Sequence, residues 1–309
     1  MKPYISVVIP VYQGANTLGL LYKRLNATMM KLKKPFELIF VDDGSSDDSW
    51  KILEGLYRDD SHIRIIQLAR NFGQHNALMC GFAKSHGNIV ITLDDDLQNP
   101  PEEIGKLIAK LGEGFDVVYG QYLEKKHSPF RNFGSTLVQM VYRSIFHMQG
   151  NLTSFRALKR EVVLGILSYH HHFTFVDGLI SWHTRRIGYV DVQHSKRYTG
   201  SSTYSFSKLL ILSVNLLTNF SIVPLQVASV IGFTLSFMGL SLALFYFLKK
   251  ILYDIPVTGF ATIIIAVLLF SGVQLITVGI IGEYIGRIHL NINRKPQFVI
   301  KTEKERERD

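Results

Sequence analysis

The sequence predicts an α/β domain with a mostly parallel sheet, followed by a region that crosses a membrane twice. Short apolar runs rich in β-branched residues alternate with helical patterns over residues 5–119, which is typical of α/β proteins. Asp, Glu, Lys and Arg are then absent from residues 209–248 and again from 255–282. The 309 residues are 47% hydrophobic and only 19% charged, which excludes a disordered chain.

The α/β part contains five candidate strands. They are expected at residues 5–10, 36–41, 63–68, 89–93 and 116–119, with helices over 14–30, 47–59 and 74–85 and another from 100 onward. Asp47-Asp48-Ser49 supplies a helix cap, and Pro100-Pro101-Glu102-Glu103 places proline and acids in a first helical turn. Alternation of strand and helix predicts a sheet covered on both faces, with ligands beyond the carboxyl ends of its strands.

The polarity of residues 125–309 predicts how the rest of the chain is organised. Residues 125–205 are less regular and are expected to form amphipathic helices and a few strands. Ile222–Leu248 and Gly259–Gly282 are each long enough to cross the roughly 30 Å of bilayer hydrocarbon; the alternative is a hairpin of buried helices in a soluble protein. The expected domains are residues 1–204, an interfacial amphipathic helix over 205–221, the membrane region 222–286, and a tail 287–309. The last residues, 301–309, alternate in charge and are expected to fray in solvent.

Two crossings place both chain ends on one side of the membrane. Arg287, Arg294 and Lys295 after the crossings favour the cytosol, whereas Lys249 and Lys250 in the connecting loop oppose it. The N-terminus enters a strand directly, without a signal peptide, so a cytosolic catalytic domain and cytosolic termini are expected.

The net charge of +9 favours an anionic membrane surface or a phosphate-bearing substrate over nucleic acid, because the chain also carries long apolar segments. The single cysteine, Cys80, excludes an intramolecular disulfide.

Two acidic clusters follow predicted strands, Asp42-Asp43 and Asp94-Asp95-Asp96. Carboxylates at strand ends can hold a divalent cation, and Mg²⁺ completes its shell with water and substrate phosphates, so the clusters indicate a nucleoside diphosphate site. The alternative is that these acids only cap helices or end turns. The sequence contains no P-loop motif and no Gly-x-Gly-x-x-Gly after its first strand, which argues against a P-loop NTPase and a dinucleotide enzyme.

An ordered set of motifs resembles the family 2 glycosyltransferases of the GT-A fold. The motifs are Val7–Tyr12, Val41–Asp47, Asn71–Ala77 and Asp94–Pro101. More narrowly, the chain is similar to polyprenyl-phosphate glycosyltransferases, which include dolichyl-phosphate mannose synthase and bacterial undecaprenyl-phosphate sugar transferases. Gly272–Arg287 and Arg294-Lys295-Pro296 resemble the membrane region and tail of the bacterial members. The resemblance covers about residues 4–300.

The resemblance implies a nucleotide-sugar site with a GT-A fold. Asp42 and Asp43 would lie near the base and ribose, and Asp94 would contact the nucleotide and its metal. Asp94, Asp96 and Gln98 would ligate Mg²⁺ or Mn²⁺. Further donor contacts would come from Pro10, Tyr12, Asn71, Asp95, Arg197 and Ser202.

The resemblance also implies an acceptor-phosphate site formed by Lys125, Arg131 and Arg156, with Asp94, Asp96, Arg131 and Arg156 as the catalytic set. Three positions depart from the family pattern. Tyr122 replaces an arginine, Ser154 replaces an acid, and Thr203 replaces a lysine. These changes affect the acceptor side and leave the metal-binding acids intact.

The implied reaction is metal-dependent, inverting transfer of one sugar from a nucleotide donor, UDP-linked, to undecaprenyl phosphate. It would occur at the cytosolic face of the bacterial inner membrane, in a homotetramer, and would serve a surface glycan such as lipopolysaccharide. The Asn71–His75 and Asp96–Ile104 segments are most similar to the formamidoarabinose branch, with glucose as the alternative sugar. A processive polysaccharide synthase would need a Gln-x-x-Arg-Trp motif and more crossings; a non-catalytic membrane scaffold would not need Asp94, Asp96 and Gln98.

Overall fold

A computed structural model describes residues 3–122, 153–171, 173–193, 195, 221–253, 259–293 and 295–306. The chain divides into two compact units. The first comprises Met1–Tyr204 together with Arg294–Asp309, and the second comprises Ser205–Asn293. The predicted interfacial helix over 205–221 lies, apart from Ser221, outside the described residues.

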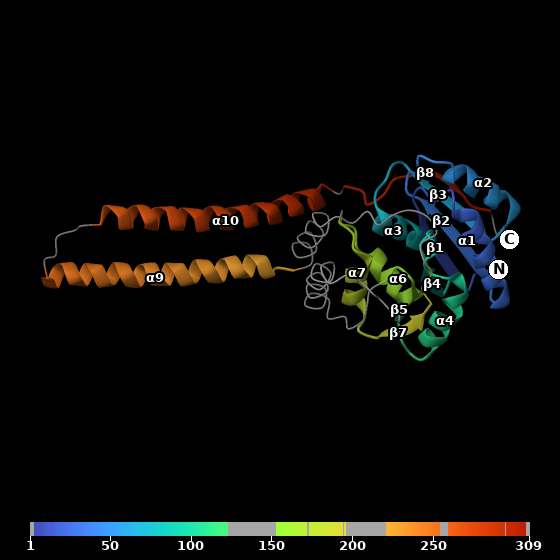
Figure 1. Ribbon diagram of the computed structural model, residues 1–309, viewed down its shortest axis with the longest axis horizontal. Helices are drawn as coiled ribbons and strands as arrows, with labels where there is room; N and C mark the ends of the chain where they lie inside the picture. Colours follow the sequence, from blue (N-terminus) through green and yellow to red (C-terminus); the bar gives the residue numbers. More distant parts are fainter. Residues whose placement is uncertain are drawn as a thin grey trace. The chain divides into compact units, whose positions relative to one another are not determined.

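The first unit is built on an eight-stranded sheet with the order β7-β5-β6-β4-β1-β2-β3-β8 (Figure 1). Its strands are β1 (Ile5–Val11), β2 (Phe36–Asp42), β3 (Ile63–Leu68), β4 (Ile89–Thr92), β5 (Val117–Tyr122), β6 (Arg156–Lys159), β7 (Ile187–Val192) and β8 (Ile300–Lys304). Strands β6 and β8 are antiparallel to their neighbours, and the other paired strands are parallel. The predicted mostly parallel α/β sheet is therefore confirmed.

Helices cover both faces of this sheet. They are α1 (Leu18–Lys31), α2 (Ser49–Asp59), α3 (Gln74–Lys84), the 3-10 turn η1 (Pro101–Glu103), α4 (Ile104–Gly112), α6 (Arg160–Leu167) and α7 (Val176–His183). Helices α1, α2 and α4 share one apolar core with Val7 and Ile9 of β1. Val8 faces the other way, because side chains alternate along a strand. There α3 approaches so closely that a Cβ on Gly81 would clash with Val8 Cγ1.

The register of the central strands brings three chain segments to one edge of the sheet. Strand β1 pairs in parallel with both β2 and β4, placing Val11 opposite Asp42 and Val8 opposite Thr92. The residues that follow β2 and β4 therefore flank the end of β1. This arrangement is the one expected for a ligand site at strand ends.

Strand β8 corrects the prediction for the end of the chain. Ile300–Lys304 pairs with the edge strand β3 instead of fraying in solvent. Buried Arg64 of β3 forms ion pairs with Glu303 and Glu305, while Lys304 Nζ lies 2.6 Å from Glu54 Oε1. The prediction of a frayed tail is wrong for this segment, because its alternating charges have partners on the sheet and on α2.

The second unit contains the helices α9 (Val223–Tyr253) and α10 (Phe260–Ile292). Val223–Lys249 and Leu269–Ile292 are long and apolar enough to cross a membrane. Their apolar side chains are largely exposed, including Phe233, Leu240 and Leu275. Such surfaces are unfavourable in water, so the two helices indicate association with a membrane. Within the unit, Tyr284 Oη donates a hydrogen bond of 2.7 Å to the Ser221 carbonyl.

Candidate active site

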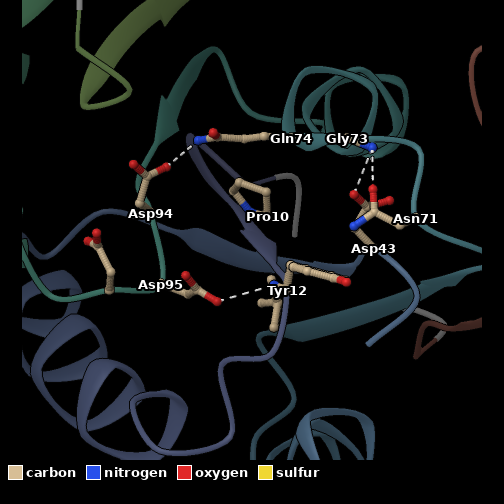
Figure 2. Close-up of a pocket in the computed structure, with 10 residues that line it drawn as sticks. Pro10, Tyr12, Asp43, Asn71, Gly73, Gln74, Asp94 and Asp95 are labelled. Atoms are coloured by element: carbon tan, nitrogen blue, oxygen red, sulfur yellow. Dashed lines mark hydrogen bonds between the residues drawn. The ribbon is translucent and has the colours of Figure 1, made fainter. Parts of the chain in front are cut away.

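A cavity of about 360 Å³ lies at the carboxyl ends of β1, β2 and β4 and beside the amino end of α3 (Figure 2). Its described lining consists of Pro10, Val11, Tyr12, Asp43, Asn71, Gly73, Gln74, Asp94, Asp95 and Asp96. The fold thus brings together four sequence motifs that are far apart along the chain. Of the predicted donor-site residues, Pro10, Tyr12, Asp43, Asn71, Asp94 and Asp95 meet here.

The first acidic turn is built into the wall of the cavity through main-chain hydrogen bonds. Asp43 Oδ1 accepts from the Phe72 N–H at 2.7 Å. Asp43 Oδ2 accepts from the Gly73 N–H at 2.8 Å (Figure 2). Burial raises the pKa of the Asp43 carboxyl, and these two N–H donors oppose that rise. Asp43 therefore shapes the loop that carries Asn71 into the lining.

Asp42 occupies a different position. It is fully buried, and its carboxylate accepts hydrogen bonds from the Ser45 N–H at 3.1 Å and from Gln67 Nε2 at 3.2 Å. The described cavity lining does not include Asp42. Of the two acids placed near the nucleotide by resemblance, the structure brings Asp43 to the cavity and uses Asp42 to join its turn to β3.

The second acidic turn presents three consecutive carboxylates to the cavity. Asp94 Oδ1 accepts a hydrogen bond from Gln74 Nε2 at 2.6 Å, and its Oδ2 accepts one from the Ser154 hydroxyl. Asp95 Oδ2 accepts from the Tyr12 N–H at 3.3 Å (Figure 2). Asp96 Oδ1 accepts from the Gln98 N–H at 3.1 Å. Side chains from α3 and from the segment before β6 therefore set the orientation of Asp94.

The surroundings of Asp95 strongly perturb its carboxyl group. Burial raises the pKa of its carboxyl to about 7, the Tyr12 N–H lowers it, and the neighbouring charges of Asp94 and Asp96 raise it further. Gly14 allows this carboxylate its position, since a Cβ there would lie 2.5 Å from Asp95 Oδ2. The turn concentrates negative charge that a bound cation would neutralise.

The donor set of this turn fits a divalent cation. Asp94 and Asp96 both line the cavity, and hard carboxylate oxygens are the ligands that Mg²⁺ and Mn²⁺ take in proteins. Within the described residues, no group of three His, Cys, Asp or Glu side chains is arranged as a complete protein-only metal site. Two carboxylates with the remaining positions left to phosphate oxygens and water match the way Mg²⁺ is usually held at phosphate sites. Gln98, the third predicted ligand, is outside the described lining, and its main-chain N–H donates to Asp96 Oδ1.

Arg156 lies behind the cavity. Its side chain is only 1% exposed, forms an ion pair with Asp177, and donates from Nε to Thr92 Oγ1 at 3.1 Å. The described lining does not include it. The sequence analysis did not identify Asp177, Thr92 or Gln74, since their roles depend on contacts between distant segments. The local signals that pointed to this region were Arg156 itself and the replacement of an acid by Ser154.

The replacement at Tyr122 also has a local partner. Its hydroxyl donates a 2.5 Å hydrogen bond to Asn99 Oδ1. Burial, together with the charges of Asp94 and Asp96, raises the pKa of Tyr122 to about 12, so this side chain is a neutral hydrogen-bond donor at neutral pH. The other predicted residues Lys125, Arg131, Arg197, Ser202 and Thr203 lie outside the described residues.

Comparison with known proteins identifies the class to which this fold and site belong. The model of the family described as "Glycosyl transferase family 2" matches residues 6–176. This range includes all the strand-end motifs that line the cavity. The chain belongs to this family and is a glycosyltransferase.

Relatives that align over nearly the whole chain show which members of the family it resembles. The chain is 37% identical over 302 residues to an undecaprenyl-phosphate 4-deoxy-4-formamido-L-arabinose transferase of Proteus mirabilis, covering 96% of this chain and 93% of that protein. A protein of the same name from Pseudomonas aeruginosa is 37% identical over 312 residues, covering 97% and 91%. The predicted resemblance to polyprenyl-phosphate glycosyltransferases is therefore confirmed.

A solved structure supports the fold. Glucosyl-3-phosphoglycerate synthase from Mycobacterium tuberculosis, in complex with Mn²⁺, UDP and phosphoglyceric acid, is similar with a TM-score of 0.53 at 21% identity, over 70% of this chain and 76% of that chain. At this identity the likeness concerns the fold alone. It agrees with the GT-A fold predicted from the sequence motifs.

Proposed function

We propose that this glycosyltransferase moves a single sugar from a UDP-linked donor to undecaprenyl phosphate at a membrane surface. The observation that carries the proposal is the similarity to the named undecaprenyl-phosphate formamidoarabinose transferases over 96% of the chain. It extends across both the domain with the cavity and the two apolar helices α9 and α10, which we call the apolar hairpin. The sugar in our proposal is 4-deoxy-4-formamido-L-arabinose or a close analogue, with glucose as the alternative. The product would serve a surface glycan such as lipopolysaccharide.

The cavity suits the diphosphate end of such a donor. Pro10, Tyr12, Asp43 and Asn71 would bound the nucleoside part, and Asp94 and Asp96 would hold Mg²⁺ or Mn²⁺ against the diphosphate. The cation, when bound, supplies positive charge to the departing diphosphate. The role of the chain is to aim these carboxylates, and the hydrogen bonds from Gln74 and Ser154 do so for Asp94.

The proposed acceptor explains why no protein base is required. A phosphate monoester has a second pKa of about 6, so at neutral pH it is already an anionic nucleophile. Attack on the anomeric carbon from the side opposite the diphosphate inverts that centre. The main task of the protein is then to bring two anions together, which cationic side chains achieve. Lys125, Arg131 and Arg197 are our candidates for this task.

The apolar hairpin fits an acceptor that cannot leave the bilayer. A polyprenyl chain remains among lipid tails, so the enzyme must act at the membrane surface. We propose that the first unit and both chain ends are cytosolic at the bacterial inner membrane and that the chain forms homotetramers. Labelling of single cysteines introduced at either end of the Cys80→Ser protein, in intact and permeabilised cells, tests the orientation.

Glycolipid formation by the detergent-purified protein tests the proposed reaction. Undecaprenyl phosphate and Mg²⁺ or Mn²⁺ are supplied with UDP-glucose, UDP-galactose, UDP-N-acetylglucosamine or UDP-4-deoxy-4-formamido-L-arabinose in separate reactions. We expect one donor to give a single-sugar product, and the absence of product from every donor would contradict the proposal. A ladder of longer products would instead favour a processive synthase. Retention of the cellular phenotype by Asp96→Asn would favour a non-catalytic scaffold, with Asp59→Asn on the exposed surface of α2 as the matched control.

A further inference from the structure

A cluster of buried polar side chains lies behind the acidic turn. It consists of Thr92 from β4, Tyr119 from β5, Arg156 from β6 and Asp177 from α7. Arg156 is 1% exposed and Asp177 is 7% exposed. Their ion pair is joined by the Tyr119 hydroxyl, which donates to Asp177 Oδ1 at 2.8 Å, and the Arg156 guanidinium lies 5.9 Å from the Tyr119 ring centre. The cluster thus ties three strands and a helix together.

The Asp177 carboxylate compensates the buried charge of the Arg156 guanidinium. Burial alone would lower the pKa of the guanidinium, but the Asp177 carboxylate and the Tyr119 hydroxyl raise it above its usual value. A buried ion pair of this kind contributes little net stability compared with apolar side chains of similar size. The low net stability of the Arg156–Asp177 pair indicates that its role is to position other side chains.

The first connection from this pair to the cavity runs through Thr92 and Ser154. Thr92 Oγ1 accepts the hydrogen bond from Arg156 Nε and donates its own hydrogen to the Ser154 carbonyl. The Ser154 hydroxyl in turn donates to Asp94 Oδ2. Arg156 therefore holds the residue that orients one oxygen of Asp94.

The second connection runs through the start of α7. Asp177 lies in the first turn of α7, and the N–H of the preceding Val176 donates to His75 Nδ1 at 3.4 Å. His75 follows Gln74, whose side chain donates to Asp94 Oδ1. One oxygen of Asp94 is thus linked to Arg156 through Ser154 and Thr92. The other is linked to Asp177 through Gln74, His75 and Val176.

We propose that Arg156 and Asp177 form a positioning pair that aims Asp94 into the cavity through Ser154 and Gln74. Asp177 compensates the charge of Arg156 and keeps its guanidinium turned away from the substrates. This role replaces the acceptor-phosphate contact that family resemblance implies for Arg156. The inference rests on the proposed function only in that it assigns Asp94 to the nucleotide–metal unit.

The test compares Asp177→Asn, Ser154→Ala and the double variant in the full-length, detergent-purified protein. Loss of a residue that supports a metal ligand typically reduces metal affinity or activity by about 10–100-fold. We expect each single variant to weaken binding of UDP with Mn²⁺ in titration calorimetry by about tenfold or more, while binding of UDP without metal stays within about twofold. The double variant should bind no more weakly than Asp177→Asn alone, because Asp177 supports both connections to Asp94, whereas Ser154 belongs only to the first.

Asp116→Asn is the matched control. Asp116 is also 7% exposed and forms ion pairs with Arg186 and Lys159, but it precedes β5 at the other end of that strand. We expect this variant to bind UDP with Mn²⁺ like the wild type. If Asp116→Asn weakened metal-dependent binding as much as Asp177→Asn, or if losses were additive in the double variant, the positioning role would be refuted.

Arg156→Lys separates positioning from acceptor contact. It retains the charge but cannot reproduce the two-sided guanidinium contacts. We expect kcat to fall while KM for undecaprenyl phosphate stays within about twofold, because a positioning residue acts through Asp94. A large rise in KM for undecaprenyl phosphate with kcat unchanged would overturn the proposal. The calorimetric arm needs no acceptor, so failure of the proposed sugar transfer and failure of this inference remain distinguishable.

Discussion

The two acidic turns look alike in the sequence but differ in how the fold uses them. Each follows a strand paired with β1, and each places carboxylates at the same edge of the sheet. Asp43 is held by two main-chain N–H groups of the loop that it shapes. Asp94 is held by the side chains of Gln74 and Ser154. Asp43 is thus fixed by the backbone of its neighbouring loop, whereas the orientation of Asp94 depends on side chains from two distant segments.

The largest expected effect comes from the second turn. Asp96→Asn should reduce turnover by about 100-fold or more, because a lost charge beside the departing diphosphate removes transition-state stabilisation. Its thermal unfolding midpoint should stay close to that of the wild type. Initial rates of glycolipid formation and thermal unfolding in the same detergent measure both, with Asp59→Asn as the control. If Asp96→Asn lost as much stability as Asp43→Ala in the first turn, the two turns would not differ in the way proposed.

The opposite pattern is expected for the first turn. Asp43→Ala leaves the Phe72 N–H without this acceptor and the Gly73 N–H with Asn71 Oδ1 alone. We expect the free energy of unfolding to fall by about 1–3 kcal/mol. Binding of UDP without metal should weaken with it, since the Asn71 loop forms part of the cavity wall. Thermal unfolding and calorimetry check the two effects, and exposed Asp48→Ala serves as the control. Wild-type stability for Asp43→Ala would show that the loop needs no such support.

A smaller effect is expected at two glycines, one in the first acidic turn and one beside the second. Gly44 has φ +69°, and a Cβ there would lie 2.6 Å from the Arg70 carbonyl carbon. A Cβ at Gly14 would meet side chains instead, 2.5 Å from Asp95 Oδ2 and 3.4 Å from Val11 Cγ1. We expect Gly44→Ala to cost about 1–3 kcal/mol, from backbone strain and a main-chain clash, and Gly14→Ala to cost less because a side chain can rotate. Unfolding midpoints of the two variants, compared side by side, decide the order.

The smallest effect is a pH dependence at the end of the first turn. Burial tends to raise the pKa of the Asp47 carboxyl, but hydrogen bonds from Ser49 and from the Ala15 N–H hold it below its usual value. A depressed folded-state pKa stabilises the fold above the unfolded value of about 3.9, and this contribution is lost as the pH falls through the folded-state pKa.

Asp47→Asn isolates that charge effect. Because the side chain is exposed, we expect the variant to lose only about 0.5 kcal/mol at pH 7. Its stability should converge with that of the wild type as the pH falls below about 3. Unfolding midpoints at pH 7, 5 and 3 measure the convergence. A difference that grew on acidification would contradict the depressed pKa of Asp47.

Much of the fold could be predicted because it depends on local patterns. The apolar runs that become β1 to β4 are short and buried on both faces, and their alternation with helical segments specifies a parallel sheet. The two long apolar segments are recognisable from length and composition alone. Clustering of acids at strand ends was likewise sufficient to locate the cavity.

The segments that escaped prediction are those whose partners lie far away in the chain. Strand β6 has the sequence Arg-Ala-Leu-Lys and pairs antiparallel between β4 and β5, so neither its length nor its polarity indicates a central strand. Strand β8 carries alternating charges that resemble a solvated tail. Buried Arg64 supplies the counter-charge that binds β8 to the sheet edge.

The sequence by itself determined the alternating strands and helices, the apolar hairpin and the acids at the sheet edge, because local periodicity and composition decide burial. Only the tertiary structure decided which acids face the cavity, that Arg156 is turned inward against Asp177, and that residues 300–304 return to the sheet. The physical reason is that a charged side chain takes its role from the partner that folding brings within a few ångströms. Sequence separation carries no information about that partner.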